Sequence, residues 1–190
     1  MAHDVRTGGI PAPGTTTVVI MGVTGTGKTT VMRALAKRLQ WPSAEGDEFH
    51  SAANIEKMRG GHPLTDADRW PWLEAIAAWI GERERAGESA LVACSALRRA
   101  YRDLLRRGHA SVWFAHLVAP ADLLEDRMEH RPGHYMPVSL LASQLDTLEP
   151  LGADEPGIVV STRSPVEELV EEIIRRLPPV MRGSVDSHAP

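Results

Sequence analysis

The stretch "MGVTGTGKTT", residues 21–30, lies between the β-branched run "TTTVVI" (15–20) and "VMRALAKRLQ" (31–40), which has a helical pattern. Gly22 to Thr29 match G-x-x-x-x-G-K-[ST], and a strand before the loop and a helix after it are the context that this motif requires. A flexible glycine turn is the alternative interpretation. The sequence therefore predicts a phosphate-binding loop. The residues assigned to the phosphates are Gly22, Val23, Thr24, Gly25, Thr26, Gly27, Lys28, Thr29 and Thr30.

The residue types of this loop suit a nucleoside triphosphate. Glycines let successive backbone N–H groups point at an anion, and the dipole of the following helix adds positive potential at the same place. Lys28 brings a mobile positive charge to the outer phosphates, and Thr29 offers its hydroxyl to Mg²⁺, which bridges phosphate oxygens. We therefore expect a nucleoside triphosphate and Mg²⁺ as cofactors, with Lys28 in a catalytic role.

Two absences in the sequence narrow the class of nucleotide-binding protein. The only asparagine, Asn54, is followed by Ile55, so the N-K-x-D motif with which regulatory GTPases read guanine cannot be present. The runs "ALVAC" (90–94) and "SVWFAHLV" (111–118) lead into Ser and Ala-Pro, so neither is followed by the Walker B carboxylate of motor ATPases. Small-molecule kinases remain as the natural class. A regulatory module that binds ATP without transferring phosphate is the non-enzymatic alternative.

Short apolar runs alternate with helical patterns along the chain. The runs at 15–21, 90–94, 111–118 and 157–161 suit strands that are buried on both faces, and a shorter strand is expected near "PSAEG" (42–46). Alternation of strands and helices is typical of a doubly wound sheet with right-handed crossovers. The sequence predicts an α/β fold with three layers, α/β/α, around a mostly parallel five-stranded sheet.

One domain, residues 15–177, accounts for these elements, because the chain is long enough for one substantial core and short for two. Its last helix has a clear start signal, with Ser164 as N-cap, Pro165 in the first turn and Glu167 completing a capping box. Gly, Pro and polar residues at both ends indicate flexible tails. These tails are residues 1–14 and 178–190.

Composition and charge exclude several classes of partner. The net charge of −4 is the wrong sign for a protein that neutralises many nucleic-acid phosphates. Apolar runs stay well short of the roughly 20 residues that a membrane span needs, and the first residues lack a signal-peptide pattern. Cys94 is the only cysteine, so an internal disulfide is impossible. We expect a cytoplasmic protein that binds neither nucleic acid nor membrane.

The densest polar stretch is "GDEFHSAANIEKMRGGHPLTDADRWPWL" (46–73), which follows the expected short strand. Asp47 could accept the proton of an attacking hydroxyl or help to hold Mg²⁺, and its alternative roles are the N-cap of the next helix or a turn. Arg69 could grip a carboxylate through two hydrogen bonds, or could pair with Asp66 or Asp68 on the surface. Further candidates for binding the acceptor are His50 and Lys57.

The order of motifs resembles the gluconokinase family, which is related to shikimate kinase. The motifs are G-D-x-x-H, N-I-x-K-M, G-x-P-L-x-D-x-D-R, P-W-L, "CSALRRAYRDLLR", "RPGHYM" and "SQLDTLEPL", and they cover about residues 16–176. The resemblance implies ATP-dependent phosphorylation of D-gluconate at its 6-hydroxyl, with Mg²⁺. Another small hydroxy-acid, such as shikimate or another aldonate, is the alternative acceptor. Dimers occur in the family, which leaves a homodimer open.

The resemblance also implies roles for residues after the third predicted strand. Ser95 is expected to bond a hydroxyl of the sugar acid and Arg98 to add positive charge, although an N-cap and a surface arginine are equally consistent with the sequence alone. His134, within "RPGHYM", is a further candidate for substrate binding. The sequence departs from the family pattern at Ser51, where proline is common, and at Tyr135, where phenylalanine is usual.

A mobile lid is predicted at about residues 120–138. Arg127 and Arg131 are four residues apart and share one helical face, so both can reach the same anion if the segment closes. Guanidinium groups over the transferred phosphoryl group would offset charge in the transition state, and closure would exclude water. Arg127 and Arg131 are therefore predicted as catalytic. Surface ion pairs with Glu125 or Glu129 are the alternative.

Overall fold

The computed structural model describes residues 14–129 and 138–177. Its strands are β1 (Thr17–Met21), β2 (Ser43–Glu45), β3 (Ala90–Ala93), β4 (Val112–Val118) and β5 (Gly157–Ser161). Its helices are α1 (Lys28–Leu39), α2 (Ala52–Arg59), α3 (Asp66–Arg85), α4 (Arg99–Arg106), α5 (Ala121–Glu129), α6 (Val138–Thr147) and α7 (Val166–Arg176), together with the 3-10 helix η1 (Gly46–Phe49). Strand and helix alternate almost throughout.

The five strands form one parallel sheet in the order β2-β3-β1-β4-β5. β1 lies in the centre, so the loop that follows it opens where the strand order reverses, between β3 and β4. The sheet is parallel because a helix returns the chain between most strands. The predicted five-stranded α/β fold is confirmed, including the short strand before Asp47.

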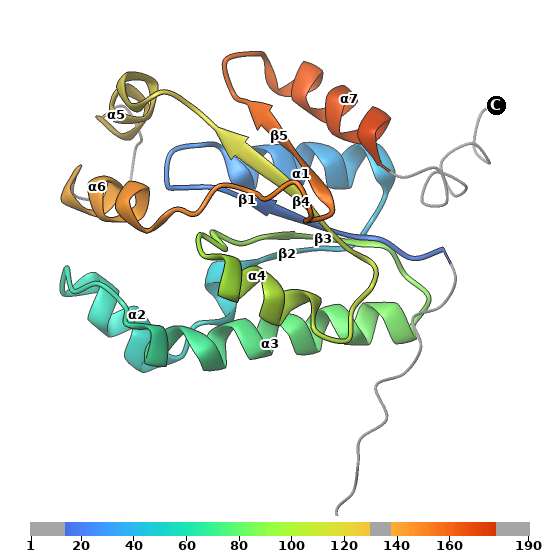
Figure 1. Ribbon diagram of the computed structural model, residues 1–190, viewed down its shortest axis with the longest axis horizontal. Helices are drawn as coiled ribbons and strands as arrows, with labels where there is room; N and C mark the ends of the chain where they lie inside the picture. The colour runs from blue at the N-terminus through green and yellow to red at the C-terminus, as the bar shows by residue number, and fades with distance from the viewer. Residues whose placement is uncertain (1–13, 130–137, 178–190) are drawn as a thin grey trace, which may run out of the picture.

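Helices cover both faces of the sheet (Figure 1). One apolar cluster joins the sheet to α1 and α7, and the other joins it to α3 and α4. Val18 and Ile20 of β1 point into the first cluster, whereas Val19 and Met21 point into the second. β1, β3 and β4 are buried on both faces, as the sequence predicted. The same prediction is wrong for β5, an edge strand in which Val159 is 52% exposed. α5 and α6 lie at the end of the sheet toward which the strand arrows point (Figure 1).

The predicted start of the last helix is wrong. The N-cap of α7 is Pro165 and not Ser164, and no side chain caps the helix. Pro165 has a ψ of 154°, outside the helical range, so the helix begins one residue later than expected. The hydroxyl of Ser164 therefore precedes the cap position, and the predicted capping box with Glu167 does not form.

Within residues 14–129 and 138–177, no helix is both long enough and apolar enough to cross a bilayer.

Candidate active site

The phosphate loop follows β1 and leads directly into α1. Its glycines Gly22, Gly25 and Gly27 have φ angles of 139°, 80° and 88°. At Gly22 a Cβ atom would lie 2.5 Å from the carbonyl oxygen of Leu117, so only glycine fits between the loop and β4. The hydroxyl of Thr26 donates to the carbonyl of Val23 at 2.8 Å and closes the loop on itself. The backbone thus has the curvature of an anion-binding loop.

Lys28 and Thr29 begin α1 with their side chains turned toward neighbouring elements. The ammonium of Lys28 donates to the carbonyl of Val23 at 3.0 Å, across the loop. The hydroxyl of Thr29 donates to the Glu45 carboxylate at 3.2 Å. Glu45 ends β2 and was not among the predicted site residues. An acidic residue at the end of a strand is the signal that could have found it. Thr30 lies exposed in the first turn of α1.

Asp47 lies in η1, at the end of the sheet beside β3. Gly46 places it there, because a Cβ atom at Gly46 would lie 2.5 Å from the Ala93 carbonyl oxygen. The indole of Trp72 donates to the Gly46 carbonyl at 2.6 Å and fixes the turn from α3. Burial raises the pKa of Cys94 to about 12, and the charges of Asp47 and Lys28 both act on this pKa. Asp47 and Lys28 therefore approach the same end of β3.

The alternative role of Asp47 as a helix cap is wrong. α2 is capped by Ser51, whose hydroxyl accepts the Asn54 N–H at 3.2 Å. Ser51, which departs from the family pattern, is thus used to start this helix. Asp47 lies four residues earlier and is exposed.

His50 lies between the acidic and the basic groups of the predicted acceptor side. Its ring stacks on Trp72 with the centroids 4.4 Å apart. Burial lowers the pKa of His50 below its usual value; Asp47 opposes this shift and Arg69 adds to it. His50 is therefore neutral near pH 7, and both Asp47 and Arg69 are close enough to act electrostatically on its imidazole.

Arg69 and Arg98 meet around one aromatic side chain. Their guanidinium carbons lie 5.7 and 5.9 Å from the centre of the Tyr101 ring. Arg69 donates to the Tyr101 hydroxyl at 3.0 Å, Arg98 pairs with Asp66 at 2.7 Å, and Tyr101 donates to Asp66 at 2.5 Å. Burial and the Asp66 bond raise the pKa of Tyr101. We call these four residues the guanidinium cluster. Tyr101 was not among the predicted site residues, and Asp66 was predicted only as a possible partner of Arg69.

Lys57 has a structural partner in this protein. Its ammonium lies 2.6 Å from Asp68, which also accepts the backbone N–H of Thr65 in the capping box of α3. The bond from Lys57 is the largest of several contacts that lower the pKa of Asp68. Lys57 thus joins α2 to the start of α3, and its ammonium, predicted to bind the acceptor, is paired with Asp68.

Ser95 and Arg98 belong to the loop between β3 and α4. The carbonyl of Ser95 accepts the N–H of Gly22 at 3.3 Å, which brings this loop against the phosphate loop. α4 is capped at Arg98, so Ser95 is not the N-cap that was considered as its alternative role. Arg98 pairs with Asp66, but its side chain is 40% exposed, so it is also the surface arginine that was considered as its alternative role.

Arg127 reaches from α5 to the nucleotide side of the sheet. Its guanidinium donates to the hydroxyl of Thr162 at 2.9 Å, to the Thr162 carbonyl at 2.7 Å and to the Gly25 carbonyl at 3.5 Å. These partners lie in the phosphate loop and after β5, so Arg127 is placed beside the candidate phosphate site. Arg131 and His134 lie outside the described residues.

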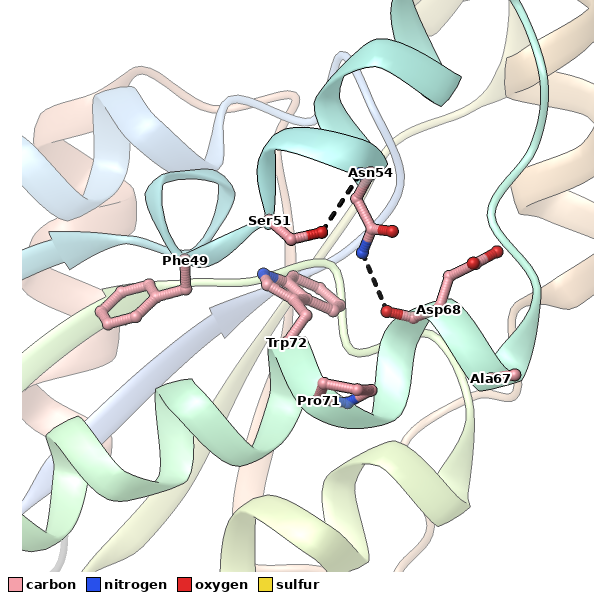
Figure 2. A pocket seen from close by; sticks show the side chains of 7 residues that line it. All are labelled: Phe49, Ser51, Asn54, Ala67, Asp68, Pro71 and Trp72. Atoms are coloured by element: carbon pink, nitrogen blue, oxygen red, sulfur yellow. Dashed lines mark hydrogen bonds between the residues drawn. The ribbon is translucent and has the colours of Figure 1, made fainter.

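A separate cavity of about 340 Å³ lies between η1, α2 and α3 (Figure 2). Asn54 donates to the Asp68 carbonyl at 2.9 Å on its wall. Of the predicted catalytic residues that the structure describes, Lys28, Asp47 and Arg127, none lines this cavity. Its lining residues are Phe49, Ser51, Asn54, Ala67, Asp68, Pro71 and Trp72.

Comparison with known proteins shows the family of this chain. Residues 18–151 match the AAA domain family. A gluconokinase from Gluconobacter oxydans is 51% identical over 158 residues, which span 83% of this chain and 89% of that protein. A solved sugar kinase from Janibacter sp. HTCC2649 superposes with a TM-score of 0.81 at 50% identity, covering 87% of this chain and 98% of the other. A gluconokinase structure from Sinorhizobium meliloti has a TM-score of 0.79 at 41% identity, covering 93% and 100%.

Proposed function

Since this chain belongs to the gluconokinase family, we propose that it transfers the terminal phosphoryl group of ATP to the 6-hydroxyl of D-gluconate, giving 6-phospho-D-gluconate and ADP. One observation carries the proposal for the site: the phosphate loop, Asp47 and a pair of guanidinium groups gather at the carboxyl end of one parallel sheet. This is where ligands bind in open α/β sheets. Gluconate needs both kinds of group, because it has an alcohol at one end and a carboxylate at the other.

Asp47 is proposed as the general base. Its carboxylate would accept the proton of the 6-hydroxyl while the oxygen forms its bond to the terminal phosphorus and the bond from phosphorus to ADP breaks. The position of Asp47, directly after Gly46 and beside the end of β3, supports this role. Lys28 would leave the Val23 carbonyl and offset the negative charge that develops on the phosphoryl oxygens.

The guanidinium cluster is proposed to bind the carboxylate of gluconate. Arg69 and Arg98 lie on the same aromatic ring, and bidentate guanidinium contacts suit a planar carboxylate. Asp66 now holds Arg98, so the substrate carboxylate would replace one carboxylate by another. Ser95 and His50 would add hydrogen bonds to the hydroxyls of the acid.

The residues around Thr29 fit Mg²⁺. The hydroxyl of Thr29 and the Glu45 carboxylate are hard oxygen ligands, of the type that Mg²⁺ prefers, and they already lie 3.2 Å apart. We propose that Thr29 binds the ion directly and that Glu45 holds it directly or through water. When bound, Mg²⁺ would offset the charge of the outer phosphates.

Arg127 is proposed to contact the nucleotide phosphates. Its present bonds to Gly25 and Thr162 keep the guanidinium beside the phosphate loop. Closure of a lid over residues 120–138 that brings Arg127 and Arg131 to the same anion stays a prediction, as does substrate binding by His134. So do the domain limits at residues 15 and 177, a cytoplasmic location and a homodimer.

A coupled assay tests the proposal. Purified protein, ATP and Mg²⁺ are mixed with D-gluconate, and formation of 6-phosphogluconate is followed as NADP⁺ reduction by its dehydrogenase. The expected result is NADPH formation that requires gluconate. ADP release is then measured with shikimate, other aldonates and nucleoside monophosphates as acceptors. A clear preference for any of these over gluconate, or ADP release that is independent of the acceptor, would overturn the proposal.

A further inference from the structure

Arg102 is the most completely buried basic side chain among the described residues. It projects from α4 and is 1% exposed. Its guanidinium forms two bonds with the buried Glu155 carboxylate, at 2.6 and 2.9 Å. Burial of an ion pair gives little stability compared with apolar packing, because both charges lose their hydration. Stability alone therefore does not explain why Arg102 and Glu155 are buried together.

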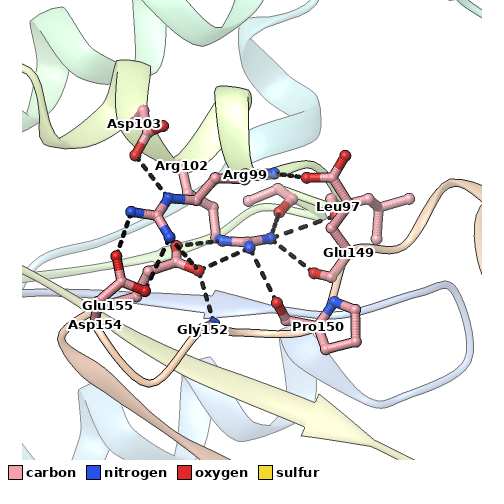
Figure 3. A network of polar contacts seen from close by, with 10 residues as sticks. Leu97, Arg99, Arg102, Asp103, Glu149, Pro150, Gly152, Asp154 and Glu155 are labelled. Carbon is pink, nitrogen blue, oxygen red and sulfur yellow. Dashed lines mark hydrogen bonds and ion pairs between the residues drawn. The ribbon is translucent and has the colours of Figure 1, made fainter.

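The remaining N–H groups of Arg102 bind carbonyls from two separate segments (Figure 3). In the loop between β3 and α4, residues 94–98, which we call the acceptor loop, it donates to Ala96 at 3.2 Å and to Leu97 at 3.4 Å. In the connection from α6 to β5, residues 148–156, which we call the return segment, it donates to Glu149 at 3.0 Å and to Pro150 at 3.3 Å. One side chain thus fastens two loops that are far apart in the sequence.

The acceptor loop has a backbone conformation that requires such support. Ala96 is fully buried and has a φ of 43°, in the left-handed region that residues other than glycine rarely adopt. A residue held there costs free energy and persists only where surrounding contacts enforce it. The contacts at Ala96 and Leu97 include the guanidinium of Arg102 and the N–H of Glu149, which donates to the Leu97 carbonyl at 2.8 Å.

The turn at Ala96 decides where the two polar residues of the loop point. Ser95 precedes it, with its carbonyl on the N–H of Gly22, and Arg98 follows it in the guanidinium cluster. If Ala96 relaxed to a negative φ, the chain would leave the turn in another direction, and Ser95 and Arg98 could not both keep these contacts.

We propose that Arg102 is a positioning residue: by binding the carbonyls of Ala96 and Leu97 from the buried side, it holds the acceptor loop in the conformation that presents Ser95 and Arg98 to the acceptor. This inference rests on the proposed function, because it assumes that the loop binds gluconate. Arg102 does not touch the substrate itself. Its loss is therefore expected to weaken acceptor binding far more than nucleotide binding.

The test compares Arg102→Lys with Arg107→Lys, the same exchange at an exposed position at the end of α4. Lysine keeps the charge but cannot bind four carbonyls and a carboxylate together. We measure kcat, the gluconate KM at saturating ATP and the ATP KM at saturating gluconate. Urea unfolding shows whether each variant is folded. For Arg102→Lys the gluconate KM is expected to rise about tenfold or more while the ATP KM changes less than about threefold. Arg107→Lys is expected to match the unaltered protein.

A rescue experiment separates positioning from general support. Glycine adopts φ near 43° without strain, so Ala96→Gly added to Arg102→Lys is expected to recover a large part of the gluconate KM. If Arg102→Lys does not fold, Glu155→Gln takes its place in the test. Glutamine has nearly the size of glutamate but binds the Arg102 guanidinium less tightly, and a rise of about threefold in the gluconate KM is expected. An unchanged gluconate KM in the folded variants, equal losses for gluconate and ATP, or no rescue by glycine would overturn the inference. If the unaltered protein does not phosphorylate gluconate, the proposed function fails instead.

Discussion

The buried imidazole of His116 predicts a specific dependence of stability on pH. His116 lies in β4, in register with Met21 of β1 and Val159 of β5, and it is 2% exposed. Among the described residues neither of its ring nitrogens has a hydrogen-bond partner. Burial, and to a smaller extent the charge of Arg102, lower the pKa of His116 to about 4, although Glu155 partly opposes this shift. The perturbation that tests this is acidification, with His116→Leu as the comparison.

The magnitude follows from proton linkage. The folded-state pKa of about 4 lies below the ordinary value of 6.5, so between these two pH values the unfolded chain binds more protons than the folded one. Stability is therefore complete above about pH 6.5 and falls as the pH is lowered through this window. For this single group, the free energy of unfolding is expected to fall by about 2 kcal/mol from about pH 7 to about pH 5.

Urea unfolding followed by circular dichroism at several pH values measures this effect. Other groups also titrate, including His50, whose pKa is lowered by burial. The informative quantity is therefore the difference between the unaltered protein and His116→Leu, which is expected to change by about 2 kcal/mol over the same range. The exposed His62, replaced by glutamine, controls for loss of one imidazole. A His116→Leu protein with the same pH dependence as the unaltered one would refute the reasoning.

Three further predictions concern the reaction. Lys28→Ala and Asp47→Asn should each lower kcat by about 10² to 10⁴ while the urea midpoint stays nearly constant, and normal turnover in folded Asp47→Asn would remove it from the mechanism. Arg69→Lys should raise the gluconate KM about tenfold with little change in kcat, because a two-bond grip is lost and the charge is kept. If that KM stays the same, the carboxylate binds elsewhere. Glu45→Gln should raise the Mg²⁺ concentration for half-maximal rate about tenfold through its contact with Thr29, and an identical Mg²⁺ titration would exclude that role.

The elements that the sequence predicted well are those whose signal is local. The phosphate loop and the buried strands each depend on a few consecutive residues, and Gly22 is required because a Cβ atom there would lie 2.5 Å from the Leu117 carbonyl oxygen. The prediction for the first residue of α7 was wrong, although its signal is also local, because Pro165 has an extended ψ angle. Local patterns therefore predict the presence of an element better than its first residue.

The candidate site was predicted less completely, because its contacts join residues that are far apart in the chain. Tyr101 and Asp66 are separated by 35 positions, and their bond becomes visible only when α3 and α4 pack together. Glu45 could have been suspected from its place before Gly-Asp. The role of Arg102 could not have been predicted, since an arginine in an amphipathic helix is expected to face solvent. In this structure it is enclosed by carbonyls of two loops.

The same contacts explain how charge can select the acceptor. In the guanidinium cluster, Asp66 already satisfies Arg98, and the Tyr101 hydroxyl accepts a bond from Arg69. A carboxylate that enters can replace Asp66 at Arg98 without leaving a guanidinium uncompensated. A neutral sugar offers only hydroxyls, which are weaker acceptors for a charged donor, so it gains little by displacing Asp66. On the proposed role of this cluster, discrimination between an acid and the corresponding neutral sugar would follow from competition with the carboxylate of Asp66.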